Sequence, residues 1–266
     1  MDLQLTGRRA LITGSTSGLG EATARLLARE GAAVVIHGRN AERAQAVADS
    51  IAAGGGKASV AVGDLATDAG ADATAESALA GGDVDILVNN AGAYEHLNWT
   101  DATADVWQDT YNTNVVSGVR MIQRLVPAMR DRDYGRVVTI GGGLSTQPFS
   151  SHPHYNASLA ARHNLAVSLA RDLAGTRVTS NVVAPGAILV PAVRDFLVKL
   201  SPGRGWGETW EEIEYNSVRE IVPNDRVRYG RPEEIAGAVA YLCGPYAEYI
   251  SGATIRVDGG TVRGAF

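Results

Sequence analysis

The sequence predicts an α/β fold in which helices cover both faces of a parallel β-sheet. Two observations predict this fold class. Along the 266 residues, short apolar runs of strand length alternate with longer segments of helical pattern, which is typical of repeated βα units. Runs such as Val34-Val35-Ile36 are apolar at consecutive positions, as expected for strands that are covered on both sides.

The first part of the chain shows two successive βα units. A strand predicted over 10–12 leads to a helix over 21–30, which ends at Gly31, a residue suited to the left-handed turn after a helix. A second strand over 33–37 is followed by a helix over 41–53, and three consecutive glycines end that helix.

The rest of the chain completes a sheet of about seven strands. The remaining strand candidates span 58–62, 86–89, 137–140, 177–184 and 254–257. A long helix is predicted over 151–174. No linker or repeat interrupts the pattern, so we expect one domain over 1–266. The segment 190–228, rich in Trp, Pro, Gly and charge, is expected to form a mobile helical substrate flap.

Composition argues against several function classes. The 24 basic and 29 acidic residues give a formal charge of −5, with no run of Lys or Arg that would attract nucleic acid or a membrane. Residues 58–119 include no Lys or Arg while Asp recurs, which we interpret as a solvated acidic face. There is one cysteine, no charged leader before an apolar run, and no apolar stretch of about 20 residues. We expect a cytoplasmic protein without a metal site.

A glycine-rich turn follows the first predicted strand. Gly14, Gly18 and Gly20 lie where that strand ends and the next helix begins. Glycine permits a tight turn and lets a pyrophosphate approach the backbone amides at the positive end of the helix. The spacing therefore predicts a dinucleotide site.

Three motifs in this order resemble those of the short-chain dehydrogenase/reductase family. They are the turn Thr13-Gly14-Ser15-Thr16-Ser17-Gly18-Leu19-Gly20, the later Asn89-Asn90-Ala91-Gly92, and Tyr155. The resemblance covers nearly the whole chain outside the flap. It implies a single-domain Rossmann-type doubly wound sheet and hydride transfer between a nicotinamide and a carbonyl or alcohol carbon.

The second strand indicates which nicotinamide nucleotide binds. It ends in His37-Gly38-Arg39, without the acid that would accept the ribose hydroxyls of NAD. The Arg39 guanidinium can pair with a 2′-phosphate, and Ser15 can add a hydrogen bond, so NADP is expected rather than NAD.

The resemblance extends this site to the adenine and nicotinamide ends. It places Asp64 and Leu65 beside the adenine and Pro185-Gly186 with Ile188 beside the carboxamide, where Val190 replaces the family's usual threonine. The expected cofactor-binding residues are Gly14, Ser15, Ser17, Gly18, Leu19, Arg39, Asp64, Leu65, Asn90, Ala91, Gly92, Tyr155, Pro185, Gly186 and Ile188.

The expected catalytic residues are Tyr155 and Asn114, and two neighbouring positions depart from the family pattern. A phenol has a pKa near 10, and a lysine ammonium lowers it by charge attraction. The family has that lysine four residues after the tyrosine, where this chain has Leu159, and a serine thirteen residues before it, where this chain has Gly142. The chain therefore has an atypical catalytic set.

Four residues are candidate substitutes for the missing groups. Arg162 lies two helical turns after Tyr155 on the same helix face, where it is either a solvated arginine or a cation for the tyrosine. Ser145 lies three residues past the expected serine. His152 and His154 precede the helix as surface histidines or as acid–base groups.

The predicted partner is a small, partly apolar or aromatic substrate. The residues expected either to line its cleft or to pack within the loops are Tyr94, His96, Trp99, Phe149, Trp206 and Trp210. By resemblance, the chain is expected to form a homodimer or homotetramer through the helix over 151–174.

The altered catalytic positions leave other functions open. Besides an NADP-dependent oxidoreductase, they allow a cofactor-binding pseudoenzyme or a lyase, isomerase or cyclase that reuses the cleft and Tyr155.

Overall fold

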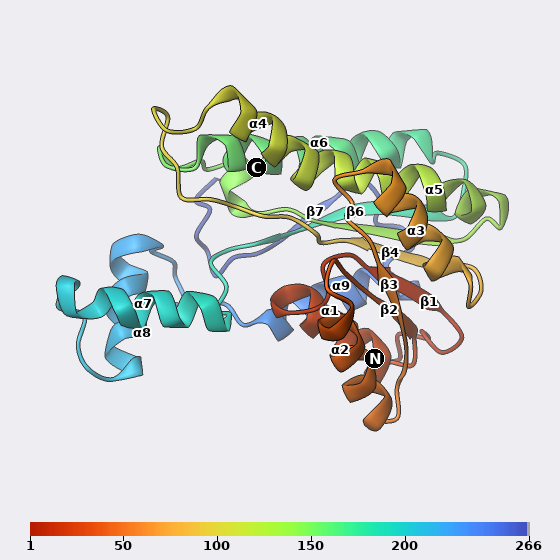
Figure 1. The fold of residues 1–266 in the computed structure, drawn as a ribbon, viewed down its shortest axis with the longest axis horizontal. Coiled ribbons are helices and arrows are strands. Elements are labelled where there is room, and N and C mark those ends of the chain that lie inside the picture. Colours follow the sequence, from red (N-terminus) through yellow and green to blue (C-terminus); the bar gives the residue numbers. More distant parts are fainter. Residues whose placement is uncertain (265–266) are drawn as a thin grey trace.

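The computed structural model describes residues 1–264 and contains a seven-stranded sheet in the order β3-β2-β1-β4-β5-β6-β7 (Figure 1). All of its paired strands run parallel. The strands are β1 (Arg9–Ile12), β2 (Ala33–Gly38), β3 (Lys57–Val62), β4 (Ile86–Asn89), β5 (Gly135–Ile140), β6 (Val178–Pro185) and β7 (Thr254–Val257). The order reverses between β1 and β4, which is where such folds bind nucleotides.

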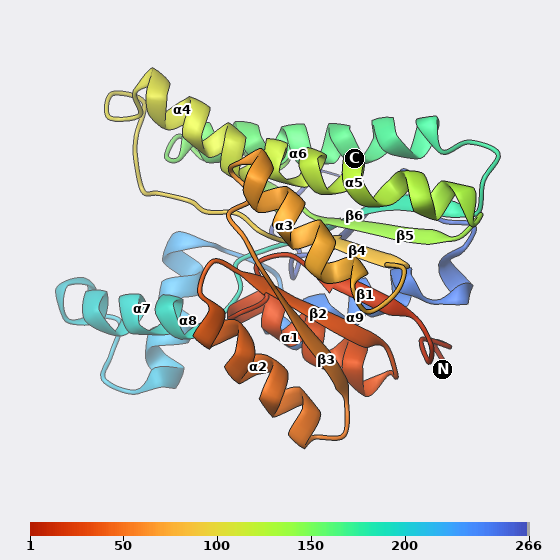
Figure 2. The ribbon, with the colours of Figure 1, turned by 45° about the vertical axis from the view of Figure 1, so that its right-hand side comes forward.

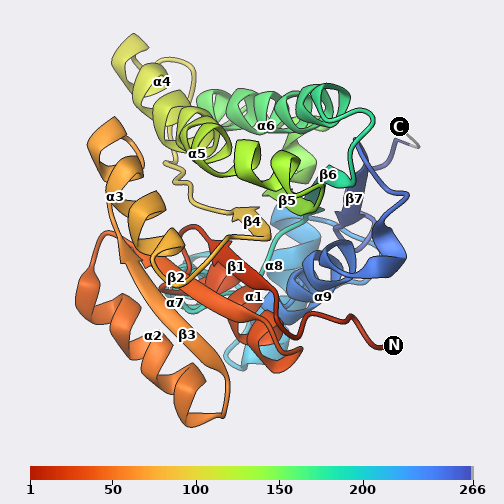
Figure 3. The ribbon, with the colours of Figure 1, turned by 90° about the vertical axis from the view of Figure 1, so that its right-hand side faces the viewer.

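Helices cover both faces of the sheet, as Figure 3 shows. One face carries α1 (Gly18–Arg29), α2 (Ala41–Ala53) and α9 (Pro232–Cys243). The other carries α3 (Asp68–Leu79), α4 (Ala104–Tyr111), α5 (Ser117–Asp131) and α6 (Pro153–Asp172). A π-helical turn, Asn112–Val116, joins α4 to α5, and single 3-10 turns lie at Gly143–Ser145 and Pro245–Ala247.

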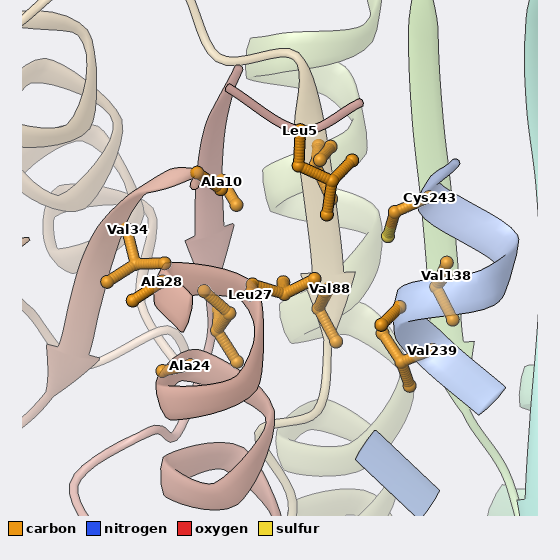
Figure 4. Packing of buried hydrophobic residues seen from close by; sticks show 14 of the residues in the cluster. Leu5, Ala10, Ala24, Leu27, Ala28, Val34, Val88, Val138, Val239 and Cys243 are labelled. Atoms are coloured by element: carbon orange, nitrogen blue, oxygen red, sulfur yellow. The ribbon is translucent and has the colours of Figure 1, made fainter. Parts of the chain in front are cut away.

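Consecutive strand residues enter opposite cores. Val34 and Ile36 are buried with Leu27 of α1 and Val239 of α9 (Figure 4), whereas Val35 is buried on the other face. This arrangement explains why the strand sequence is apolar at consecutive positions, and it confirms the predicted fold class.

The segment after β6 forms two further helices, α7 (Pro191–Arg204) and α8 (Trp210–Ile221), which project beyond one end of the sheet (Figure 2). These helices enclose an apolar cluster of their own. Its buried members are Leu197, Trp206, Ile213, Val218 and Tyr229. The helical content expected for 190–228 is therefore present.

The predicted elements match these bounds closely. Every predicted strand is present within one or two residues, and the helix over 41–53 has its predicted ends. The first helix begins at Gly18 rather than at residue 21, because the glycine turn already provides its first residues.

Asp68 and Asp72 of the acidic stretch are solvent-exposed, as predicted, and they also pair with arginines of a neighbouring helix. Arg120 of α5 bonds Asp68 of α3 at 2.8 Å, and Arg124 bonds Asp72 at 2.7 Å. The acidic residues thus join α3 to α5. Within residues 1–264, no helix combines the length and the apolar character that crossing a membrane requires.

Candidate active site

The glycine turn between β1 and α1 forms a cradle that larger side chains would fill. Gly14 and Gly18 have φ angles of 65° and 57°, a conformation that favours glycine. A Cβ on Gly20 would lie 2.4 Å from the Gly14 carbonyl oxygen. The N-cap residue Ser17 makes no side-chain bond to the α1 amides, so these amides remain available to an anion.

Thr13 and Asn90 join this turn to the loop after β4. The Thr13 hydroxyl accepts hydrogen bonds from the Asn90 and Ala91 amides at 3.0 and 2.9 Å. The Asn90 side chain donates to the Thr13 and Gly14 carbonyl oxygens at 2.9 and 3.1 Å. These bonds fix the two nucleotide motifs relative to each other. Sequence reasoning did not identify Thr13, although its place at the start of the glycine motif was a signal.

Ser15 holds the turn internally, which corrects its expected role as a phosphate ligand. Its hydroxyl is fully buried, donates to the Ile12 carbonyl at 2.7 Å and accepts from the His37 amide at 2.9 Å. His37 in turn accepts from the Gly14 amide at Nδ1, and its Nε2 faces the Gly63 carbonyl at 3.2 Å. Burial lowers the pKa of His37 to about 4, so the ring is neutral.

The expected adenine-side residues differ in their exposure. Arg39 follows β2 and is exposed, so its guanidinium is accessible to a phosphate. Asp64 is also exposed, and its carboxylate accepts from the Ala66 amide. The Leu65 side chain is buried in the core beside α3, so only the backbone of Leu65 can face a nucleotide.

The nicotinamide-side motif lies beside the glycine turn. A Cβ on Gly186 would be 2.9 Å from Cα of Asp258, so glycine is required where β6 leaves the sheet. Ile188 forms an isolated bridge with Gly230. A Cβ on Gly18 would lie 3.5 Å from the Val190 side chain, so Val190 brings a methyl group next to the turn.

Asn114 connects the β4 loop to the start of α6. Its side chain is buried, accepts from the Ala93 amide at 2.8 Å, and donates to the Ala93 carbonyl at 2.9 Å and the Ser158 hydroxyl at 3.0 Å. Ser158 donates to the Tyr155 carbonyl at 2.7 Å. The two expected catalytic residues are therefore joined through one serine.

Tyr155 lies half-buried in the first turn of α6. Its ring is 5.5 Å from that of Tyr94. Burial raises the pKa of Tyr155 above its ordinary value, whereas the positive charge of Arg162 acts to lower it. The Arg162 charge thus acts in the direction that the family's lysine would.

Arg162 is a buried cation, which excludes the solvated alternative. Its guanidinium donates to the carbonyl oxygens of Asn114, Ile140 and Ala91. Burial lowers the pKa of Arg162 to about 10, so it remains charged at neutral pH. These three acceptors lie at the ends of β4 and β5 and in the π-helical turn, next to both nucleotide motifs.

Leu159 and Gly142 pack against each other at the positions where the family has lysine and serine. Leu159 is buried, and a Cβ on Gly142 would lie 2.9 Å from its Cδ1 atom. The two departures from the family pattern therefore form one apolar contact.

The Ser145 hydroxyl lies next to Gly142, the position of the expected serine, and bonds within the loop after β5. Its hydroxyl donates to the Gly142 carbonyl at 2.8 Å and lies 3.3 Å from Nδ1 of His163. Nε2 of His163 accepts from the Gly142 amide at 3.3 Å. Ser145 and His163 therefore brace the loop after β5.

The two histidines before α6 have different surroundings. His154 is buried beside Trp107, which corrects its expected place on the surface. His152 has a φ angle of 58° and hydrogen-bonds Ser151 and His96. Burial and the neighbouring His96 lower the pKa of His152.

Some of the expected aromatic residues lie beside Tyr155 or contact its neighbours. The Tyr94 and His96 rings meet edge to face, with their centroids 5.4 Å apart. The His96 ring stacks on the ring of Phe196 in α7, with a centroid separation of 5.9 Å. Phe149 is partly exposed. Phe196 was missed by sequence reasoning; an aromatic residue within the predicted flap was the available signal.

The three tryptophans pack on residues of their own segments, as the alternative of loop packing allowed. Trp206 is buried inside the α7–α8 cluster and bonds Glu220 at 2.6 Å. Trp210 packs on the same cluster beneath Arg194. Trp99 packs on Trp107 of α4, 5.7 Å away. Phe196 of α7, and not the buried Trp206, therefore contacts the His96 ring.

Comparison with known proteins defines the family. A model of the short chain dehydrogenase family matches residues 8–198. The uncharacterised oxidoreductase YvaG of Bacillus subtilis is 39% identical over 269 residues, which cover 100% of each chain. The chain therefore belongs to the short chain dehydrogenase family, which confirms the predicted family and its oxidoreductase class.

Two solved structures resemble this one over nearly their whole length. L-Sorbose reductase from Gluconobacter frateurii, complexed with NADPH and L-sorbose, is 33% identical with a TM-score of 0.92, covering 99% of this chain and 100% of that one. A 3-oxoacyl (acyl-carrier-protein) reductase from Agrobacterium tumefaciens, with NADP bound, is 37% identical with a TM-score of 0.88, covering 97% and 96%.

Proposed function

We propose that this protein is an NADP-dependent oxidoreductase that interconverts a carbonyl and an alcohol on a small substrate. The observation that carries the proposal is the hydrogen-bonded joining of the glycine turn to the β4 loop by Thr13 and Asn90. This joining supports a nucleotide laid across the point where the strand order reverses.

The cradle fits the nucleotide on chemical grounds. The α1 amides without a side-chain cap suit a pyrophosphate, and Gly20 lets the start of α1 pack closely against the Gly14 carbonyl in the turn that presents them. Arg39 suits a 2′-phosphate, and the two similar structures with NADPH or NADP bound support the same choice. When bound, the nicotinamide supplies or accepts the hydride.

The residues of this chain handle the proton. Tyr155 donates its phenolic proton to the substrate oxygen during reduction and removes the alcohol proton during oxidation. Asn114 fixes the first turn of α6 through Ser158 and so positions the phenol. Gly142 provides no side-chain donor, so Tyr155 is the polarising group for that oxygen.

The aromatic side chains near Tyr155 support a substrate type. The Tyr94 ring lies beside Tyr155, and Phe196 stacks on His96, which contacts Tyr94 and His152. These side chains suit a small substrate with an apolar or aromatic part. We also propose that the chain works as a homodimer or homotetramer, with one domain per chain and 190–228 closing on the substrate.

The test measures binding of NADPH and NADH and then cofactor oxidation against a panel of carbonyl compounds. The proposal expects tighter NADPH binding and turnover that Tyr155→Phe abolishes while binding persists. Tight NADPH binding with no turnover of any carbonyl would favour a pseudoenzyme. Turnover of a carbonyl compound without cofactor oxidation would favour a lyase, isomerase or cyclase.

A further inference from the structure

We propose that Arg162 supplies the positive charge that the family places at position 159, from one helical turn further along α6. The proposal deepens the proposed function and rests on it. It concerns a residue that acts through Tyr155, so Arg162 is a positioning and electrostatic residue.

The helix geometry permits this exchange of position. Tyr155, Leu159 and Arg162 are separated by four and three residues on α6, so all three lie on one face of the helix. Leu159 and Arg162 are both buried. The apolar side chain fills the space against Gly142, and the charged one extends under the β4 loop.

The contacts of Arg162 place its charge beneath the nucleotide motifs. A Cβ on Gly92 would lie 2.9 Å from Nη2 of Arg162 and 3.1 Å from the Asn114 side-chain oxygen. The guanidinium therefore lies under the loop that carries Asn90 and Gly92, next to the expected catalytic asparagine. A fixed cation there acts on Tyr155 through a protein interior that screens it little.

The surroundings stabilise a charged arginine. Three carbonyl oxygens accept its hydrogen bonds, and charge-assisted bonds of this kind are strong. A cavity of about 10 Å³ adjoins the guanidinium and is lined in part by Asn89 and Thr139. The Asn89 amide and the Thr139 hydroxyl have no protein partner within residues 1–264, so the cavity, about the size of one water, adjoins polar atoms that a water could bond.

The groups that act on Tyr155 come from two elements. Arg162 from the same helix lowers its pKa, and Tyr94 from the segment after β4 raises it, while burial raises it most. His96 and His152 lie beyond the Tyr94 ring. Arg162 is thus the cation that opposes burial at this phenol.

A purely structural role is the competing explanation, because three backbone acceptors would also justify a buried arginine. Arg162→Gln separates the two roles, since glutamine keeps donors for the carbonyls and removes the charge. Arg136 of β5 is the matched control: it is equally buried and donates to the Gly135 and Arg177 carbonyls, and Arg136→Gln removes a buried charge away from the site.

The measured quantity is the pH at which Tyr155 ionises. It is obtained from the absorbance of tyrosinate, after subtraction of the titration of a protein that carries the same substitution together with Tyr155→Phe. It is recorded with and without NADP and beside the melting temperature. Arg162→Gln is expected to raise this pH by about one unit and lower carbonyl reduction at neutral pH about 100-fold. Arg136→Gln is expected to leave the titration unchanged.

Two further variants complete the test. Leu159→Lys combined with Arg162→Gln returns a cation to the family position and is expected to restore the parental titration and at least part of the turnover. Arg162→Lys keeps the charge with fewer bonds and is expected to titrate as the parent even with a lower melting temperature. A parental titration in Arg162→Gln, or a raised one in folded Arg162→Lys, would overturn the proposal.

The Tyr155 titration can be measured without turnover. A failure of the proposed function can therefore be distinguished from a failure of the proposed role of Arg162. If the parent reduces no carbonyl but Arg162→Gln still raises the Tyr155 titration, the proposed reaction is wrong and the role of Arg162 is retained. If the parent is active and the titration does not move, only the role of Arg162 fails.

Discussion

Leu159 occupies the space that a side chain at Gly142 would need. The Cβ of such a side chain would lie 2.9 Å from Cδ1 of Leu159. Gly142 itself is extended, with φ of 178°, a conformation that any residue adopts. The absence of a side chain there is therefore explained by the volume of Leu159, and the two positions are coupled.

A double-mutant cycle on this pair tests the coupling. Gly142→Ala alone should lower the free energy of unfolding by about 1 kcal/mol, because it overpacks against Leu159. Leu159→Ala alone should cost about 2–5 kcal/mol, because it opens a buried cavity. In the Leu159→Ala background the cost of Gly142→Ala should vanish, as measured by urea unfolding. Simple additivity of the two costs would contradict the coupling.

Arg39 provides a test of cofactor choice. Arg39→Ala should weaken NADPH binding about 10–100-fold, since a charged bond to the 2′-phosphate contributes about 1.5–3 kcal/mol, and should leave NADH binding unchanged. Isothermal titration with both nucleotides measures this. Arg43→Ala, an exposed arginine in the next helix, should change neither affinity. An equal loss of affinity for NADPH and NADH in Arg39→Ala would contradict the assignment of Arg39 to the 2′-phosphate.

We expect the folded protein to lose stability in acid because His37 is buried in its neutral form. Its pKa is about 4 in the folded protein and 6.5 ordinarily, so between these values the unfolded chain binds the extra proton. The contribution of neutral His37 to the free energy of unfolding is complete above about pH 6.5. It declines by up to about 3 kcal/mol as the pH falls towards 4. Urea unfolding across this range measures the decline. His37→Asn should flatten it, and an unchanged slope would refute the assignment.

Phe196 tests which residue of α7 meets the substrate. Because its ring stacks on His96, Phe196→Ala should raise KM about 10-fold, corresponding to about 1.4 kcal/mol of lost contact, with NADPH affinity unchanged. Val198→Ala removes an equally exposed apolar side chain from the same helix and should not alter KM. A KM effect confined to Val198→Ala would place the substrate on the other side of α7.

The reactivity of the Cys243 thiol tests whether the core between α9 and the sheet excludes solvent. The residue is fully buried, and burial raises the pKa of its thiol to about 12. The native protein should therefore react with a thiol reagent only as it unfolds, whereas denatured protein should react at once. Rapid labelling of native protein would mean that this core opens readily.

The fold was predictable because the sequence of each strand reflects whether one or both faces of the sheet are buried. Val34, Val35 and Ile36 enter cores on opposite faces of the sheet, which the consecutive apolar residues already indicated. Motif spacing likewise located the glycine turn and Tyr155. These features depend on neighbours in sequence or on a repeated geometry.

The predictions that were wrong or left open depend on long-range packing. Ser15 belongs to a nucleotide motif, yet its hydroxyl is occupied by Ile12 and His37. Trp206 is enclosed by a cluster that forms only when α7 and α8 meet, and His154 is buried by the approach of α4. The buried state of Arg162 also requires three carbonyls from separate segments, which no local pattern specifies.

The α7–α8 segment begins and ends at nearly the same place. Leu189 and Ala187, before it, exchange backbone hydrogen bonds with Gly230, after it, at 2.8 and 2.9 Å. Between these points the helices surround an apolar cluster of their own. A segment with adjoining ends and its own core can be exchanged as a cassette without displacing the sheet, so α7 and α8 can change in evolution or by design while the seven strands stay in place.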